Sequence, residues 1–196
     1  LILGESGTGK ELVAKAVHYN GPRQKKKFVA IDCGALPESL LEAELFGFAR
    51  GAFTGADRDK VGLIEEARGG TLFLDEITNT SVALQARLLR VLQEHEVRRV
   101  GENTPRRVDV RVVAATNADI AALMTEGKFR SDLYYRLNVV TIDVPPLRER
   151  REDIPLLVEH FIRRRSGETA PGKRLAPGVV EALGRYDWPG NVRELE

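Results

Sequence analysis

Two short segments carry residue types that together could bind and hydrolyse a nucleoside triphosphate. The first, GESGTGK at 4–10, fits the pattern G-x-x-x-x-G-K and lies between an apolar run and a helical pattern. Its glycines let backbone N–H groups close around phosphate oxygens, and Lys10 reaches the outer phosphates. A fortuitous glycine turn is the alternative, and the context on both sides disfavours it. The residues expected around the phosphates are Gly4, Glu5, Ser6, Gly7, Thr8, Gly9, Lys10 and Glu11.

The second segment, TLFLDE at 71–76, is an apolar strand that ends in two acids. A parallel strand would deliver Asp75 to the carboxyl edge of a sheet, where its carboxylate can hold Mg²⁺. Glu76 would then be placed to polarise the attacking water. Paired acids after a strand also commonly start helices, so the phosphate loop is what favours the catalytic interpretation. Glu11 occupies the position where the generic phosphate loop has a Ser or Thr ligand for magnesium, so another group or water must supply that ligand.

Polar and basic groups farther along the chain could sense or stabilise the γ-phosphate. Asn117 follows an expected strand, where it could cap a helix, sense the phosphate, or do both. Arg130 and Arg136 bracket a helical pattern and would ordinarily be surface ion-pair partners. In an oligomeric ATPase such arginines reach the neighbouring subunit's nucleotide, which is worth roughly 10³–10⁵ in rate. Their spacing does not assign that role to either one.

The segment GAFTGA is rich in glycine but contains no lysine that could hold a phosphate. Leaving an aromatic side chain on a loop forgoes about 1.5–3 kcal/mol of burial, so an exposed Phe53 indicates a partner that buries it. The alternative is that Phe53 folds back onto its own subunit. The residues of this candidate partner-binding loop are Gly51, Ala52, Phe53, Thr54, Gly55 and Ala56.

Composition limits the other functions that the chain could have. Its 196 residues are 42% hydrophobic, and its net charge of +1 argues against bulk electrostatic binding of nucleic acid. The single cysteine, Cys33, excludes an intrachain disulfide and suits a reducing cytoplasm, and we expect it to be a small buried hydrophobe. The three histidines show no metal-ligand spacing, and no apolar run is long enough to span a membrane.

Strand-like and helical patterns alternate along most of the chain, which predicts an α/β fold with a mainly parallel sheet flanked by helices. Strand signals include 97–100 and 139–144, and a helix is expected at about 118–126. After Pro145-Pro146 only helical patterns remain, separated by a loop at 166–174. We therefore expect an α/β nucleotide-binding domain at 1–147 and a small helical lid domain at 148–196. Both ends interrupt a pattern, so we interpret the chain as an excised piece of a longer protein.

The chain resembles the central AAA+ domain of bacterial sigma-54-dependent transcriptional activators, the NtrC-like enhancer-binding proteins. The resemblance runs through the whole chain and rests on six segments in this order: GESGTGKE, ELFGFARGAFTGA, GGTLFLDE, FRSDLYYRLNV, PPLRER and WPGNVREL. It implies a P-loop ATPase that forms a hexameric or heptameric ring and remodels the closed promoter complex of sigma-54 RNA polymerase. DNA would then be bound only through a C-terminal domain outside this chain.

By matching positions, the resemblance assigns ATP to 4–11 and magnesium to Asp75. It assigns the activation of the hydrolytic water to Glu76. Asn117 would be the first sensor, Arg193 the sensor arginine of the lid, and Arg130 and Arg136 the candidate arginine fingers. The loop 51–56 would contact sigma-54.

Two positions depart from the family pattern. Asp32 stands where an asparagine commonly pairs with the catalytic glutamate, and a carboxylate there would repel an ionised Glu76. Phe48 and Ala49 replace a common His-Glu at the base of the GAFTGA loop.

Two other classes share part of this pattern. A helicase motor or clamp loader would use the same phosphate loop and acids, but GAFTGA would be unexplained. A nucleotide-gated scaffold without hydrolysis would not need Lys10, Asp75 and Glu76 together. Turnover of ATP separates the scaffold from the motors, and binding to sigma-54 separates the two kinds of motor.

Overall fold

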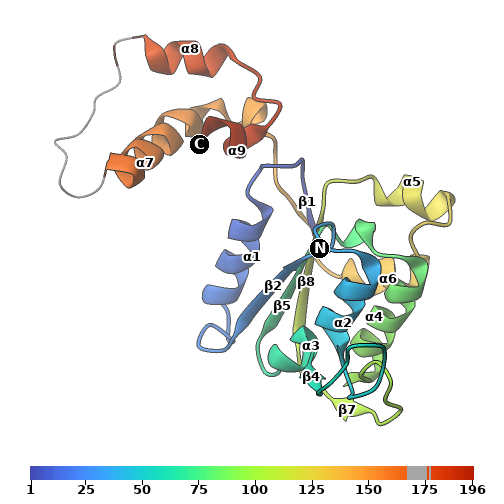
Figure 1. Cartoon of the computed structure of the whole chain (residues 1–196). Coiled ribbons are helices and arrows are strands. Elements are labelled where there is room, and N and C mark those ends of the chain that lie inside the picture. The colour runs from blue at the N-terminus through green and yellow to red at the C-terminus, as the bar shows by residue number, and fades with distance from the viewer. Residues whose placement is uncertain (167–175, 177) are drawn as a thin grey trace. The chain divides into compact units, whose positions relative to one another are not determined.

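The computed structural model describes residues 1–166, 176 and 178–196, which form two compact units (Figure 1). The first unit comprises Leu1–Leu3 and Glu11–Ile142, and the second comprises Gly4–Lys10 and Asp143–Glu196. The loop expected at 166–174 lies outside the described residues, apart from Ser166, with which a helix ends.

A five-stranded sheet organises the first unit, in the order β2-β5-β8-β1-β9. The central strand β5 is parallel to β2 on one side and to β8 on the other, and β1 is parallel to β8. This arrangement confirms the expected mainly parallel sheet. The strands are β1 (Ile2–Leu3), β2 (Phe28–Asp32), β5 (Thr71–Asp75), β8 (Arg111–Thr116) and β9 (Ile142–Asp143).

Helices cover both faces of this sheet, with α1 on one face and α2, α4 and α6 on the other (Figure 1). Alternate residues of β5 point to opposite faces. Leu72 and Leu74 line an apolar space together with side chains of α3, α4 and α6, whereas Phe73 stacks on Phe28. Each such buried side chain contributes about 1.5–3 kcal/mol to folding. The helices are α1 (Lys10–Tyr19), α2 (Glu38–Phe46), α3 (Leu63–Glu66), α4 (Val82–Glu94), α5 (Ile120–Thr125) and α6 (Ser131–Leu137).

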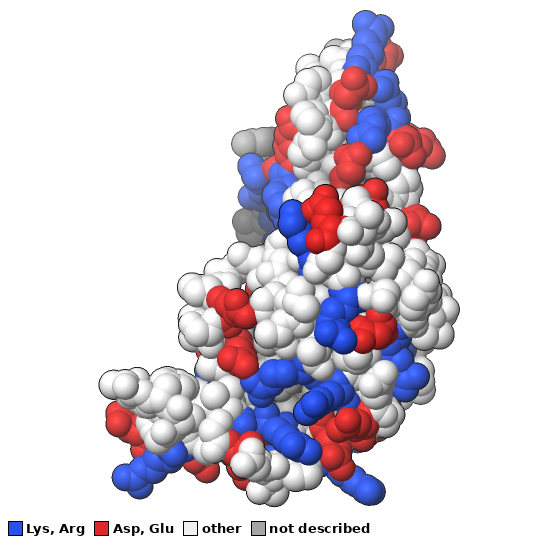
Figure 2. Space-filling view, turned by 90° about the vertical axis from the view of Figure 1, so that its right-hand side faces the viewer, with Lys and Arg blue, Asp and Glu red and all other residues white. Residues whose placement is uncertain are grey.

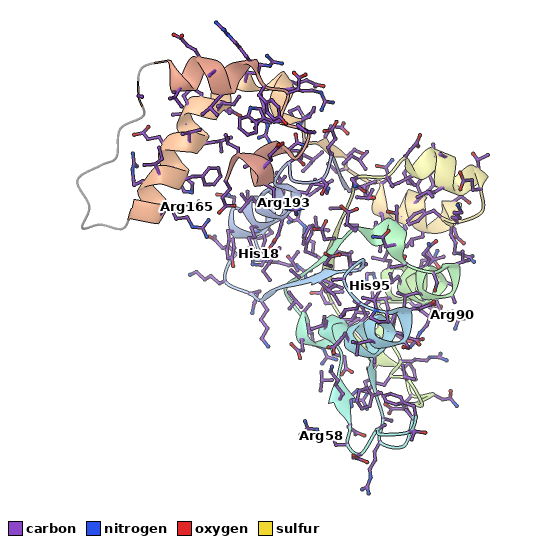
Figure 3. All side chains as sticks on the ribbon, turned by 45° about the horizontal axis from the view of Figure 1, so that its top comes forward. His18, Arg58, Arg90, His95, Arg165 and Arg193 are labelled. Atoms are coloured by element: carbon purple, nitrogen blue, oxygen red, sulfur yellow. The ribbon has the colours of Figure 1, made fainter. Side chains whose placement is uncertain are left out.

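A buried histidine joins α1 to the sheet. His18, labelled on α1 in Figure 3, is 1% exposed and lies 2.9 Å from the Thr71 hydroxyl through Nδ1. Its Nε2 lies 3.2 Å from the carbonyl oxygen of Lys26. Because a carbonyl can only accept, Nε2 is the donor in that bond. The ring therefore fixes both α1 and the segment before β2 against β5.

Two short antiparallel hairpins complete the first unit, namely β3 (Gly47–Phe48) with β4 (Lys60–Val61), and β6 (Glu96–Val97) with β7 (Arg106–Arg107). The strand expected at 97–100 was therefore placed wrongly, since only Val97 of that range is in β6. Arg99 instead turns inward, where it is 8% exposed and its Nε donates to Glu65 over 2.7 Å. Val100 forms an isolated bridge to Phe48.

The strand expected at 139–144 is also shorter, because β9 comprises only Ile142–Asp143. A turn precedes it, in which the Thr141 hydroxyl donates to the Asn138 side chain. Val139 and Val140 lie in this turn and are 80% and 66% exposed, so their apolar character did not signal a buried strand.

The second unit holds the small helical domain expected after Pro146. Its helices are α7 (Ile154–Ser166), α8 (Val179–Arg185) and α9 (Asn191–Leu195), preceded by 3-10 turns at Leu147–Glu149 and Arg151–Asp153. Its apolar core contains Leu147, Ile154, Val158 and Trp188. The indole N–H of Trp188 donates to the carbonyl oxygen of Leu183 over 2.9 Å, so the buried polar atom of this side chain is satisfied.

We expect His18→Phe to lower the free energy of unfolding by about 1–3 kcal/mol, because the change removes the partner of a fully buried Thr71 hydroxyl. The measurement is the urea midpoint of the purified protein. His160→Phe, at an exposed position on α7, is the matched control and should leave the midpoint unchanged. Equal midpoints for the two variants would contradict this account of His18.

Candidate functional site

The two predicted acids lie at the carboxyl end of β5. Asp75 is the last residue of the strand, and its Oδ1 accepts the backbone N–H of Glu76 over 3.1 Å. Glu76 follows in the left-handed conformation, with φ 50° and ψ 48°. A non-glycine residue in this region costs on the order of 1–3 kcal/mol, and such strain concentrates at functional sites.

The structure brings Glu76 together with the predicted sensor, Asn117. The backbone N–H of Asn117, just after β8, donates to Oε2 of Glu76 over 3.2 Å. The alternative role of Asn117 as a helix cap is wrong, because Asp119 is the N-cap of α5 and accepts from Ala121 and Ala122. Asn117 is therefore available as a sensor at the same sheet edge as the acids.

On the other side of β5, Asp32 pairs in register with Asp75. Its Oδ1 accepts the backbone N–H of Gly34 over 2.8 Å, so this carboxylate stabilises its own turn. Burial raises the pKa of Cys33 to about 12, and the charges of Asp32, Asp75 and Glu76 add to that effect. At neutral pH the thiol therefore stays protonated. Cys33 is a buried hydrophobe, as expected, and no nucleophile.

In the second unit, the phosphate loop has the conformation that a phosphate cradle needs. Gly7 and Gly9 have positive φ angles of 78° and 99°. A Cβ on Gly7 would lie 2.3 Å from the carbonyl oxygen of Gly190, so no other residue fits there. Lys10 is 6% exposed, and its Nζ donates to the carbonyl oxygens of Gly4 and Glu5 over 3.0 and 3.3 Å. Consecutive backbone donors beside a lysine fit the phosphates of ATP.

Glu5, the second residue of this loop, is held by side chains from the helical part of the same unit. Arg148 donates to both of its carboxylate oxygens, over 2.9 and 2.6 Å, and the Asn191 amide donates to Oε2 over 3.1 Å. The hydrogen bonds from Arg148, followed by that from Asn191, lower the pKa of Glu5 to about 2. Glu5 is thus a structural anion, a role that the sequence analysis did not assign.

Asn191 connects three segments of the second unit. It is fully buried and left-handed, with φ 54°. Its Oδ1 accepts the backbone N–H of Leu147 over 2.8 Å, and its Nδ2 also donates to the carbonyl oxygen of Ser6 over 3.0 Å. Both polar atoms of this buried side-chain amide therefore have hydrogen-bond partners. Asn191 lies in the GNVREL segment, one of those on which the family resemblance rests, but its spacing alone did not reveal that it links these three segments.

The predicted lid sensor, Arg193, reaches the phosphate loop within the same unit and is labelled on α9 in Figure 3. Its guanidinium donates to the Ser6 hydroxyl over 3.2 Å, and its backbone N–H donates to the Gly7 carbonyl oxygen over 3.2 Å. Arg150, which the sequence analysis did not select, donates to the Thr8 carbonyl oxygen over 2.8 Å. Together with Arg148 on Glu5, arginines of the helical part therefore contact the loop at four consecutive positions, 5 to 8.

The two candidate arginine fingers differ in their bonding. Arg130 precedes α6 and makes a bidentate ion pair with Asp132, over 3.0 and 2.7 Å. Arg136 is exposed in the last turn of α6 and donates to the Leu92 carbonyl oxygen over 3.3 and 3.2 Å. A neutral carbonyl holds a guanidinium less strongly than a bidentate carboxylate does. Arg136 therefore gives up the weaker contact when it turns toward another partner.

The GAFTGA loop follows β3 and presents Phe53 half exposed, at 47%. The Phe53 ring packs on Phe48 with centroids 4.9 Å apart and planes at 64°. The alternative that Phe53 folds back onto its own subunit thus holds in part, since one side of the ring is covered. Gly51 and Gly55 have positive φ angles of 80° and 95°, which allow the chain to reverse. A Cβ on Gly101, in the loop between β6 and β7, would lie 2.6 Å from the Cβ of Ala52, so this loop touches the GAFTGA loop.

The donor set can be tested against magnesium. Within the described residues no group of three His, Cys, Asp or Glu side chains gathers as a metal cage. Mg²⁺ usually keeps several waters and takes one or two carboxylates plus substrate phosphates. The carboxylate of Asp75 at the end of β5 fits that kind of ligand set.

Comparison with known families identifies the two parts of the chain. Residues 1–143 match the model of the sigma-54 interaction domain, and residues 148–196 match that of the AAA+ ATPase lid domain. The chain belongs to the sigma-54 interaction domain family. Its fold is that of an AAA+ ATPase domain followed by a helical lid, as the sequence motifs indicated.

Curated relatives of this family domain are regulators of transcription. The chain is 57% identical to the transcriptional regulatory protein ZraR of Escherichia coli K12, and 55% identical to the response regulator protein PilR of Pseudomonas aeruginosa. Both alignments include the whole chain, which spans 45% of ZraR and 44% of PilR. The chain thus corresponds to less than half of each of these relatives.

Solved structures share the fold. NtrX from Brucella abortus in complex with ATP matches with a TM-score of 0.91 and 39% identity, over 99% of this chain and 42% of that chain. The ADP complex of NtrX matches with a TM-score of 0.90 and 40% identity. A Hsp104 complex with ATPγS and casein shares the fold alone, at a TM-score of 0.69 and 18% identity.

Surface charge is mixed. Lysine and arginine side chains gather low on the face shown in Figure 2, with acidic side chains on either side of them. A small hollow in the first unit has the same mixture, since it is lined by Arg87, Arg90, Arg98, Glu94 and Glu96 beside Phe46. No helix of the described residues is long and apolar enough to cross a membrane.

The lowered pKa of Glu5 predicts a pH dependence for the second unit. Because its pKa falls from 4.5 to about 2 on folding, the stabilisation is complete above pH 4.5 and is lost as the pH falls toward 2. Glu5→Gln should flatten the acid dependence of the thermal midpoint in this range, measured by circular dichroism. Glu159→Gln, which alters an exposed pair on α7, is the control and should keep the slope of the parent. A parent slope retained by Glu5→Gln would contradict the bonding assigned to Arg148.

Proposed function

We propose that this chain is the motor of a sigma-54-dependent transcriptional activator, which hydrolyses ATP and uses the GAFTGA loop to remodel the closed promoter complex. The proposal rests on one combination of features in a chain of the sigma-54 interaction family. The backbone N–H of Asn117 holds the acid Glu76 in place, and Phe53 is half exposed. The loop has no group that could serve the chemistry of hydrolysis, so its aromatic side chain is left for a partner.

Within this proposal the predicted residues divide the work of binding and hydrolysing ATP. Residues 4–11 hold the phosphates of ATP through backbone N–H groups and Lys10, and Asp75 ligates Mg²⁺, which neutralises charge on the phosphates when bound. Glu76 accepts a proton from the attacking water. Asn117 senses the γ-phosphate through its side chain, while its backbone orients Glu76. Arg193 is the sensor of the lid.

Arg136 is the better candidate for the arginine that acts on a neighbouring subunit. Its bonds to the Leu92 carbonyl oxygen are long, whereas Arg130 is engaged by the Asp132 carboxylate. An arginine supplied in trans explains why the family forms rings, here proposed as hexamers or heptamers of this chain. We further propose a cytoplasmic location, and DNA binding only through a separate C-terminal domain. The ATP-bound NtrX structure supports the choice of nucleotide.

Phe53→Ala should separate hydrolysis from partner binding. The variant should hydrolyse ATP within a few-fold of the parent, but lose binding to sigma-54 by roughly tenfold or more in the presence of ADP and aluminium fluoride, because an apolar anchor is gone. Thr54→Ala should have the same phenotype. The rate of ATP hydrolysis and the affinity for sigma-54 are measured on the same preparations.

Leu40→Ala is the matched control, because Leu40 lies on α2 and is 45% exposed, close to the 47% of Phe53. It should keep both activities. A Phe53→Ala variant that loses hydrolysis wholesale yet binds sigma-54 would place GAFTGA in the ATP site and refute the proposal.

Hydrolysis should also require assembly. Lys10→Ala subunits, which cannot hold the phosphates, and Arg136→Ala subunits, which lack the proposed finger, should each be inactive. Mixing them should restore part of the activity, because a mixed interface can pair an intact phosphate loop with an intact arginine. The assay is ATP turnover against total protein concentration. No recovery on mixing, or a rate per subunit that is constant in a proven monomer, would count against a ring.

A further inference from the structure

Hydrogen bonds hold Glu76 at its side chain and at its backbone. Its carboxylate accepts the backbone N–H of Asn117, and its own backbone leads into a 3-10 turn at Ile77–Asn79, in which Asn79 N–H donates to the Glu76 carbonyl oxygen over 2.9 Å. The left-handed conformation of Glu76 persists only if the residues after it are fixed as well. Ile77, the first residue of that turn, is fully buried in the apolar core, so packing also holds the turn.

Thr78 fixes that turn against β8. Its hydroxyl lies 2.8 Å from the hydroxyl of Thr116, the last residue of β8, which is fully buried. The Thr116 oxygen also accepts the backbone N–H of Ala118 over 3.0 Å, so Thr116 can give its own proton to Thr78. Thr116 therefore links the 3-10 turn after Glu76 to the segment that follows β8.

The two contacts close a ring of bonds around the acid. Thr78 lies two residues after Glu76, and Thr116 lies directly before Asn117, whose N–H binds the Glu76 carboxylate. The hydroxyl pair thus joins the backbones that carry the acid and its donor. If this pair is lost, the polar link between the turn and the end of β8 is removed, and the distance from Glu76 Oε2 to Asn117 N is less firmly fixed.

We infer that Thr78 is a positioning residue for ATP hydrolysis, which holds Glu76 in its working geometry through the buried hydroxyl of Thr116. The inference rests on the proposed function, since it needs Glu76 to be the group that activates water. This role requires no contact of Thr78 with the phosphates or with the attacking water. Removing its hydroxyl should therefore lower the rate of hydrolysis without weakening the binding of ATP.

The test is steady-state hydrolysis with Thr78→Val, which keeps the shape of the side chain and removes the hydroxyl. We expect kcat to fall roughly tenfold, since small misplacements of a catalytic group cost up to about 10²-fold. The Kd for ATP should stay within about twofold of the parent. Thr78→Ser, which restores the hydroxyl, should recover most of the rate. Thr125→Val, at an exposed position on α5 where the hydroxyl bonds only its own helix, is the matched control and should behave as the parent.

A second background makes the result specific to Glu76. In Glu76→Gln protein, adding Thr78→Val should lower the residual rate by less than about twofold, because two changes that act through one group are not additive. An unchanged kcat in Thr78→Val, equal losses of kcat and ATP affinity, or full additivity with Glu76→Gln would each overturn the inference.

Thr78→Ala serves as a second variant should valine disturb folding, and it is held to the same criteria. The parent rate decides the proposed function separately. A parent that hydrolyses ATP no faster than Lys10→Ala would overturn both proposals, whereas a fast parent with an equally fast Thr78→Val would overturn only this one.

Discussion

The pairing of β5 with a parallel neighbour on each side is the constraint on which the first unit depends. Thr71–Asp75 is in register with Phe28–Asp32 over the full strand and with β8 over four residues. The approach is so close at its start that a Cβ on Gly70 would lie 2.1 Å from the Lys27 carbonyl oxygen. Because β5 is buried on both faces, it cannot shift without exposing Leu72, Phe73 and Leu74. The acids that follow inherit this fixed position.

The second unit reaches order by a different route. Its phosphate loop has no ladder of strands to hold it, and side-chain hydrogen bonds take that place. An anionic Glu5 and a buried Asn191 draw the loop toward the helical part of the unit. Such polar contacts are directional, and in a buried network each bond strengthens the others. The two halves of the chemistry are therefore held by different kinds of interaction.

The sequence revealed the parts of this structure that repeat a local rule. Glycines before Lys10, an apolar run before Asp75 and helical periodicity each depend on neighbours in the chain, so β5 and most helices were predicted. The sequence did not reveal the pairing of Thr78 with Thr116 or the bonds of Asn191, because both join segments far apart in the chain and involve residue types common in ordinary turns. The strand expected around Val139 failed for a related reason. Apolar residues predict burial only where the fold brings something to cover them, and here a turn leaves them exposed.

Trp188 gives the second unit an optical property that the first unit lacks. It is the only tryptophan of the chain, 7% exposed, and it lies in the core of the helical part with its ring edge-on to Tyr186. Fluorescence excited selectively in the indole therefore arises from this unit alone. The wavelength of its emission maximum and its quenching depend on the packing around Leu147 and Ile154, so no added dye is needed. Unfolding followed by this signal can be set beside backbone dichroism, which averages over the chain, to show whether the two units lose their structure together.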